Sequence, residues 1–285
     1  MADSLLTDKN KSDIISALKK NDLKKIISIL EKYKTGHAGT AKTKDKRFVI
    51  KEIVNHIESN SKNPVKDFFT TGNALCNMEE PAAREIGVSV IWRGYKHSPA
   101  KVKKQLLKIA DDPNWEVREY AGNAFAAVLE DNTELFDEML KLTNHPSENV
   151  RRALVFSAIG LRNEEGIKKA FTIFEPLMYD DSRYVKKNLG PFILGCYFGN
   201  AFPEQVIDQL KKWSKIKDEH VRWNIIMSFN NSFGNKYPEK ALDVISMFLN
   251  DENKTVKRAV KSTLNHISKR HKDKVLDFRK KHKLI

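Results

Sequence analysis

Trp115 and Glu119 are the two residues whose types and spacing most directly suggest chemistry. They stand four positions apart, so in a helix the indole and the carboxylate share one face, one turn from each other. An aromatic wall beside a carboxylate suits cleavage of a glycosidic bond to a cationic base. The ring contacts the base or sugar, while the anion stabilises an oxocarbenium-like transition state and orients a water. The alternative is structural: Trp115 is a packing residue and Glu119 is a surface charge paired with Arg118 or Arg152.

A repeated pattern surrounds this pair. Its skeleton is an acidic or polar turn, a few variable residues, and then Val-Arg or Val-Lys opening an apolar-periodic run. The successive valines stand at steps of 33, 35, 36 and 35 residues and are Val117, Val150, Val185, Val221 and Val256. An earlier copy is expected near Pro81, with Arg84 in the position of the basic residue. Self-similarity at this period is typical of stacked helical repeats, so the sequence predicts an all-α fold, a HEAT-like α-solenoid of antiparallel helix pairs.

A regular repeat favours one continuous domain over residues 1–285, because each added helix pair extends the same core. N-terminal helices are expected within 11–60, clear repeats over about 79–270, and a basic C-terminal helix over 271–285. In each pair the first helix should form the outer layer and the second helix the inner layer.

The stretch from Thr35 to Lys46 interrupts the apolar pattern and predicts a mobile loop. Residues 36–43 nearly match a phosphate-binding loop, but Ala41 stands where that motif needs Gly and no apolar strand precedes it. A basic loop that touches a phosphodiester backbone fits the sequence better than a nucleotide site.

The basic residues of the second helices form two sets. The first set follows the valines and is expected to be structural, pairing with the turn before it or with a neighbouring repeat: Arg118, Arg151, Lys186, Arg222 and Lys257. The second set consists of the residues one position later. A step of one residue rotates by about 100° around a helix, so the second set occupies another face. There, Glu119 is the acidic exception to a basic stripe made of Arg152, Lys187, Arg258 and Lys261. Such a stripe suits duplex DNA, whose phosphates it would neutralise without reading bases.

The chain carries 51 Lys and Arg against 37 Asp and Glu, a formal charge of +14. Residues 254–285 alone carry 12 basic and two acidic side chains. This charge favours binding of a polyanion such as nucleic acid, and the alternative is a solubilising cap on the last repeat. The longest apolar runs are too short to span a membrane, and the first ten residues lack an apolar signal core, so a cytoplasmic location is expected. The two cysteines are isolated and the eight histidines are scattered, so neither a disulfide framework nor a metal site is predicted. We expect a monomer without a cofactor.

Three short motifs resemble the HEAT-like DNA alkylation-repair family, the alkylpurine DNA glycosylases of the AlkD and AlkC type. They are residues 74–80 (ALCNMEE), residues 115–119 (WEVRE) and residues 149–153 (NVRRA), and the likeness covers roughly residues 45–270. The resemblance implies that Glu119 is the catalytic acid, that Trp115 is the aromatic before it, and that Arg152 holds the DNA backbone. It also implies lesion handling without a deep base pocket.

This sequence departs from the AlkD type at two positions. Glu119 stands where that type keeps Asp, which lengthens the arm of the carboxylate. A second aromatic of the site aligns with Pro191, so that ring is missing unless Phe192 or Tyr184 replaces it.

The resulting expectation is a hydrolase that excises cationic alkylpurines such as 3-methyladenine or 7-methylguanine from double-stranded DNA. Two alternatives stay open: a nucleic-acid-binding repeat that has lost catalysis, and a protein scaffold whose basic end binds an acidic partner.

Overall fold

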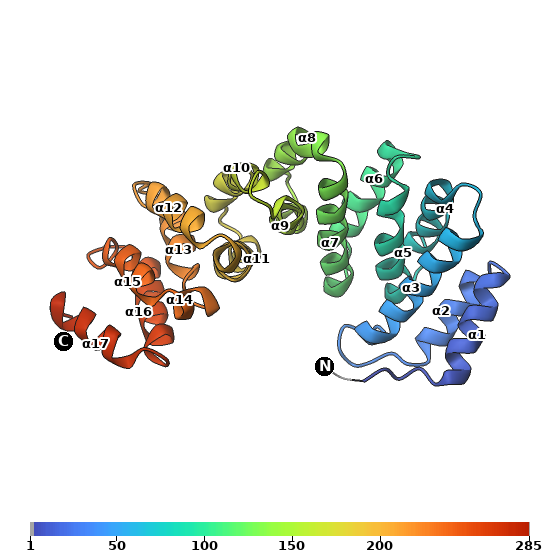
Figure 1. Cartoon of the computed structure of the whole chain (residues 1–285), viewed down its shortest axis with the longest axis horizontal. Coiled ribbons are helices and arrows are strands. Elements are labelled where there is room, and N and C mark those ends of the chain that lie inside the picture. The colour runs from blue at the N-terminus through green and yellow to red at the C-terminus, as the bar shows by residue number, and fades with distance from the viewer. Residues whose placement is uncertain (1–2, 285) are drawn as a thin grey trace. The chain divides into compact units, whose positions relative to one another are not determined.

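The computed structural model describes residues 3–284, which fold into helices joined by short turns. Within that range no strand occurs, and an isolated bridge joins Lys34 to Ala41. The chain forms two compact units, unit 1 ending at Leu135 and unit 2 beginning at Phe136. Stacked helices make up each unit (Figure 1), so the all-α solenoid predicted from the sequence is confirmed. The single domain over residues 1–285 stays a prediction.

Unit 1 contains α1 (Asp8–Lys19), α2 (Leu23–Glu31), α3 (Thr43–Asn60), α4 (Pro64–Cys76), α5 (Pro81–Ile91), the 3₁₀ turn η1 (Trp92–Gly94), α6 (Pro99–Ala110), α7 (Trp115–Asp131) and the 3₁₀ turn η2 (Thr133–Leu135). Its central helix is α5, which contacts α3, α4 and α7. The packing against α4 is close at Gly87, where an added Cβ would lie 2.5 Å from the backbone nitrogen of Cys76.

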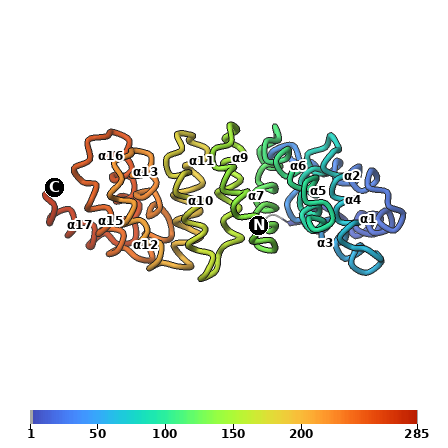
Figure 2. The backbone as a smooth tube through the Cα atoms, turned by 90° about the horizontal axis from the view of Figure 1, so that it is seen from above, coloured from blue at the N-terminus to red at the C-terminus, as the bar shows by residue number. Residues whose placement is uncertain are grey.

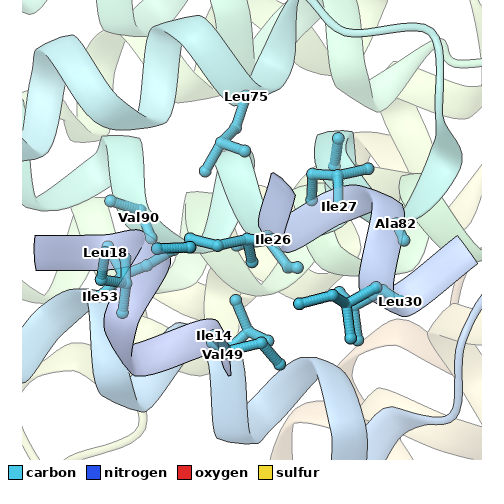
Figure 3. Packing of buried hydrophobic residues seen from close by; sticks show 14 of the residues in the cluster. Ile14, Leu18, Ile26, Ile27, Leu30, Val49, Ile53, Leu75, Ala82 and Val90 are labelled. Carbon is cyan, nitrogen blue, oxygen red and sulfur yellow. The ribbon is translucent and has the colours of Figure 1, made fainter. Parts of the chain in front are cut away.

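The core of unit 1 joins the N-terminal helices to the first repeats (Figure 3). Buried aliphatic side chains meet there from five helices, among them Ile14 and Leu18 of α1, Ile26, Ile27 and Leu30 of α2, Val49 and Ile53 of α3, Leu75 of α4, and Ala82 and Val90 of α5. Burying such side chains is the main term that stabilises a fold of this kind.

Unit 2 contains α8 (Phe136–Lys141), the 3₁₀ turn η3 (Leu142–Asn144), α9 (Glu148–Ser157), the 3₁₀ turn η4 (Ala158–Leu161), α10 (Gly166–Met178), α11 (Arg183–Asn188), the π-helix η5 (Leu189–Gly199), α12 (Pro203–Trp213), α13 (Glu219–Met227), α14 (Ser232–Lys236), α15 (Pro238–Ser246), α16 (Lys254–Ser268) and α17 (Lys272–Lys281). Within this unit α10, α12 and α15 form one layer, and α9, α11, α13 and α16 form the other (Figure 2). Unit 2 therefore has the two layers of first and second helices, while their order as outer and inner stays a prediction.

The two kinds of helix begin in different ways. Several first helices carry proline at their first position, where its missing N–H costs nothing: Pro64, Pro99, Pro203 and Pro238. The second helices begin after a short polar side chain that accepts backbone N–H groups: Asn114, Ser147, Ser182, Asp218 and Asn253. Local chemistry thus sets where each helix of the repeat starts.

The first set of basic residues makes a ladder between successive repeats. In each pair an arginine Nε lies 2.6 Å from a carboxylate oxygen in the turn of the next repeat: Arg84 with Asp112, Arg151 with Asp180, and Arg222 with Asp251. These guanidinium groups also donate to carbonyls of their own turn, as Arg151 does to His145 at 2.8 Å. The structural role predicted for this set is confirmed for Arg151 and Arg222, and Arg84 of the earlier copy makes the same kind of pair.

The π-helix η5 was not predicted, since the repeat pattern favoured ordinary α-helix pairs over this region. Gly190 permits the approach to α13: an added Cβ there would lie 2.8 Å from the carbonyl oxygen of Asn224. Pro191 has no N–H, and its carbonyl accepts a hydrogen bond of 2.6 Å from Asn231. The wider turn therefore follows from residues that break regular α-helix bonding.

Candidate functional site

Trp115 is the first residue of α7, and the preceding loop fixes it there. The Asn114 side chain accepts from the Glu116 N–H at 2.9 Å and donates to the Ala38 carbonyl at 2.8 Å. His37 meets the Trp115 indole in a T-shaped contact, with ring centroids 5.0 Å apart. Trp115 is 41% exposed, so it lies outside the core while it packs against His37.

A buried ion network lies beneath this end of α7. Lys46 is fully buried, and its Nζ lies 2.6 Å from Glu85 Oε2 and 2.7 Å from Glu116 Oε1. Thr40 donates a hydrogen bond of 2.9 Å to Glu85. The network therefore connects the 34–42 loop to α3, α5 and α7.

The network also corrects the prediction of a loop from Thr35 to Lys46. Helix α3 already begins at Thr43, and Lys46 belongs to the core because two carboxylates compensate its charge. Burial raises the pKa of the Glu85 carboxyl to about 7, although Lys46 opposes the shift. Burial also raises the pKa of the Tyr120 hydroxyl, and Glu85 and Glu116 add to that effect.

An open cavity of about 540 Å³ occupies the face of unit 1 that carries Trp115 and Glu119. Both side chains line it, so the structure brings this predicted pair together at one hollow surface. Further lining side chains come from α3, α5 with η1, and α7: Thr43, Arg47, Ser89, Trp92, Arg93, Glu116, Tyr120 and Asn123.

Trp92 and Arg47 were not predicted to join the pair. Trp92 follows α5 and Arg47 lies in α3, and no sequence spacing links either residue to α7. The packing of α5 against α3 and α7 brings them together. The Arg93 guanidinium lies 4.3 Å from the centroid of the Trp92 ring, a cation–π contact. Partial burial lowers the pKa of Arg93.

In unit 2 the predicted basic stripe divides into exposed and buried members. Lys187 of α11, and Arg258 and Lys261 of α16, are exposed. Arg152 of α9 is only 2% exposed, and its Cζ lies 4.7 Å from the Phe156 ring centroid and 4.6 Å from that of Tyr184. Two aromatic rings therefore cover Arg152, and its predicted contact with the DNA backbone stays a prediction.

The aromatic residues near Pro191 have distinct surroundings. Phe192 is 41% exposed on the π-helix, and its ring lies 5.9 Å from those of Phe156 and Tyr197. Tyr184 is engaged with Arg152. Of the two residues named as substitutes for the missing ring, Phe192 is thus the more exposed.

The basic C-terminal helix α17 is anchored through buried Val275 and Phe278, while Lys280 and Lys281 are exposed. Across residues 3–284, no group of three or more His, Cys, Asp or Glu side chains is arranged to hold a metal ion. No helix in the described part of the chain is long and apolar enough to cross a membrane.

Comparison with known proteins finds likeness to part of a natural protein and to designed repeat proteins. A stretch of 121 residues, 40% of this chain, is 30% identical to the 26S proteasome non-ATPase regulatory subunit 1 of Caenorhabditis elegans, and the matched part is 12% of that protein's length. A designed armadillo repeat protein in complex with a (KR)4 peptide matches with a TM-score of 0.35 and 15% identity, over 92% of this chain and 100% of that one. A second designed armadillo repeat protein matches with a TM-score of 0.32 and 16% identity, over 89% of this chain and 98% of that one.

The family model described as DNA alkylation repair enzyme matches residues 191–284. That segment lies within unit 2 and runs from the π-helix through the basic helix α17, whereas Trp115 and Glu119 lie in unit 1. The likeness to DNA alkylation repair enzymes thus lies in this C-terminal segment, about a third of the chain.

Proposed function

We propose that the chain is a DNA glycosylase that releases cationic alkylated purines from duplex DNA. The observation that carries the proposal is the open cavity on unit 1, lined by Trp115 and Glu119 on one face of α7. The DNA alkylation repair match in unit 2 supports the substrate class.

Two carboxylates of α7 line the cavity, and the proposal gives them different roles. Glu116 is held 2.7 Å from Lys46, so its charge is already compensated by a buried ammonium group. Glu119 lies one turn after Trp115 and is partly exposed in the cavity wall. We assign the chemistry to Glu119 because it shares one face of α7 with Trp115 and lines the cavity beside it.

The reaction is hydrolysis of the N-glycosidic bond. The bond between C1′ and the base nitrogen breaks, and its electron pair neutralises the positive charge of the alkylated base. Positive charge develops on the sugar, where a carboxylate stabilises it. A water oxygen then bonds to C1′ while Glu119 accepts the water proton. The indole of Trp115 contacts the cationic base or the sugar.

Duplex binding is assigned to unit 2. Lys187, Arg258 and Lys261 are exposed on the layer of second helices and would contact phosphates. Arg152, which the rings of Phe156 and Tyr184 cover, would contribute charge to this surface without direct contact.

The test is incubation of the protein with methylated duplex DNA, followed by chromatography for the released base. Glu119→Gln should lose base release by about 10²-fold or more while it binds the DNA at least as well, because the variant removes a negative charge that repels the phosphates of a DNA bound at the cavity. Glu130→Gln, at an exposed position near the end of the same helix, is the matched control and should keep full activity. Full base release by Glu119→Gln, or no base release by the unmodified protein, would refute the proposal that the chain is a DNA glycosylase.

Two observations favour non-catalytic alternatives. Pro191, which stands where the resemblance expects a second aromatic, uses its carbonyl to accept from Asn231 and so serves packing. DNA binding without base release would then identify a nucleic-acid-binding repeat. The similarity to a proteasome regulatory subunit favours a protein scaffold, which predicts neither DNA binding nor base release.

A further inference from the structure

Unit 1 contains a second cavity, which lies away from Trp115 and Glu119. Its walls come from the turn between α1 and α2, the last turns of α3, and α4, and we call it the α3–α4 cavity. Its volume of about 460 Å³ falls within the range of sites that enclose small molecules. Asn60, in the last turn of α3, lines it, whereas Lys46 stands in the first turn of that helix, about 20 Å away along the axis. The proposed base release uses none of the residues that line this cavity.

The most buried residues that line the α3–α4 cavity are aliphatic. Leu18 of α1 and Ile53 of α3, both labelled in Figure 3, line it together with Ile57. All three belong to the core of unit 1. They therefore offer an apolar surface on which the carbon chain of a ligand is removed from water.

The polar residues of the α3–α4 cavity donate their hydrogen atoms within the protein. The Asn60 amide nitrogen donates at 2.8 Å to a carbonyl one turn earlier in α3, and the Thr70 hydroxyl donates at 3.0 Å to a carbonyl one turn earlier in α4. The Ser61 hydroxyl donates to Asp67 Oδ2 at 2.6 Å. These side chains can offer a ligand acceptors: an amide oxygen, a hydroxyl oxygen and the second carboxylate oxygen. The ligand that suits them is a hydrogen-bond donor.

The charges around the α3–α4 cavity favour a cation. Asp67 supplies a carboxylate, and the end of α3 adds the partial negative charge of a helix C-terminus. None of the side chains that line the cavity is Lys or Arg, although the chain carries 51 such residues. Lys62 and Lys66 are close in sequence, but they are exposed and do not line it.

From this combination we infer that the α3–α4 cavity binds a primary alkylammonium ion. The ammonium group carries three N–H donors, which match the acceptors of Asp67, Asn60 and Thr70. The aliphatic chain of the ion lies against Leu18 and Ile53. A free aliphatic amine carries this group, and so does the lysine side chain of another protein. The inference does not depend on the proposed base release.

The test is a titration of the whole protein with n-pentylammonium chloride, followed by NMR of the isoleucine methyl groups. We expect saturable shifts at Ile53 and Ile57. n-Pentanol, which has the same chain and no charge, should bind at least about tenfold more weakly, because hydrogen bonds between charged groups are stronger than neutral ones. Asp67→Asn should weaken pentylammonium binding by about tenfold or more. Asp13→Asn, at an exposed position of α1 outside the cavity, is the matched control and should leave binding unchanged.

A second variant guards against a folding defect in Asp67→Asn. Ala74 is exposed and lines the cavity, so Ala74→Phe should fill the space without disturbing the core and should abolish the saturable shifts. Absent shifts in the parent, equal affinity for pentylammonium and pentanol, or unchanged binding in both variants would overturn the inference. Nα-acetyl-lysine methylamide separates the two sources of the ammonium group. Tighter binding than pentylammonium would support a lysine of another protein, and weaker binding would support a free amine.

Discussion

Lys46 Nζ lies 2.6 Å from Glu85 Oε2, and neither side chain has any exposure to solvent. Glu116 completes the network at 2.7 Å from the same ammonium group. The three residues come from α3, α5 and α7, the elements that supply the walls of the cavity on unit 1. The network therefore joins α7, which carries Trp115 and Glu119, to α3 and α5 and so holds both side chains in position.

Replacing Lys46 should destabilise unit 1 strongly. Lys46→Met leaves two carboxylates with no compensating charge, and removing one partner of a buried pair typically costs about 3–5 kcal/mol. The measurement is the free energy of unfolding in urea. Lys44→Met breaks an exposed pair with Asp3 and should cost less than about 1 kcal/mol. Equal losses in the two variants would contradict a structural role for the buried network.

Glu85 should make stability depend on pH. Because burial raises its pKa from the ordinary 4.5 to about 7, the folded protein holds this proton at a pH where the unfolded chain has lost it. The free energy of unfolding should therefore fall as pH rises between about 4.5 and 7, by about 3 kcal/mol, and level off above 7. Urea unfolding across pH 4.5–8 should show a flatter profile for Glu85→Gln. A profile with an unchanged slope would show that Glu85 titrates normally.

The arginine ladder should couple successive repeats. In the Arg151–Asp180 pair the side chains are 17% and 4% exposed, so the interaction is only weakly screened. A double-mutant cycle with Arg151→Met and Asp180→Asn should give a coupling free energy of about 1–3 kcal/mol. The Lys211–Asp243 pair, with side chains 39% and 55% exposed, is the matched comparison and should give less than about 1 kcal/mol. Similar coupling in both pairs would argue against a special role for the ladder.

Duplex DNA binding should depend steeply on salt and on the exposed cations of the second helices. Charge reversal at Lys187, Arg258 and Lys261 should lower affinity, and each lost phosphate contact should reduce the dependence of log K on log salt by about 0.9. Reversal at Lys168 and Lys169, exposed on α10 in the other layer of unit 2, should have a smaller effect. Equal losses would assign the DNA to a different surface.

Much of the repeat could be read from the sequence because its determinants are local. Proline at a first position and a polar cap three residues before each repeated valine specify helix starts wherever they occur. The four-residue step from Trp115 to Glu119 places both on one face of any α-helix, and the structure has them lining one cavity. These features depend only on bonds and rotations within a single helix.

Tertiary packing alone decided the rest of the site. Trp92 and Arg47 reach the cavity because α5 packs against α3 and α7, a contact that no spacing along the chain encodes. The same packing buries Lys46 between two carboxylates, and in unit 2 two rings cover Arg152. A charged residue in a helix shows no periodic sign of whether its neighbours will be water, a carboxylate or an aromatic face. That outcome depends on which helices meet, and it separates the buried Arg152 from the exposed Lys187.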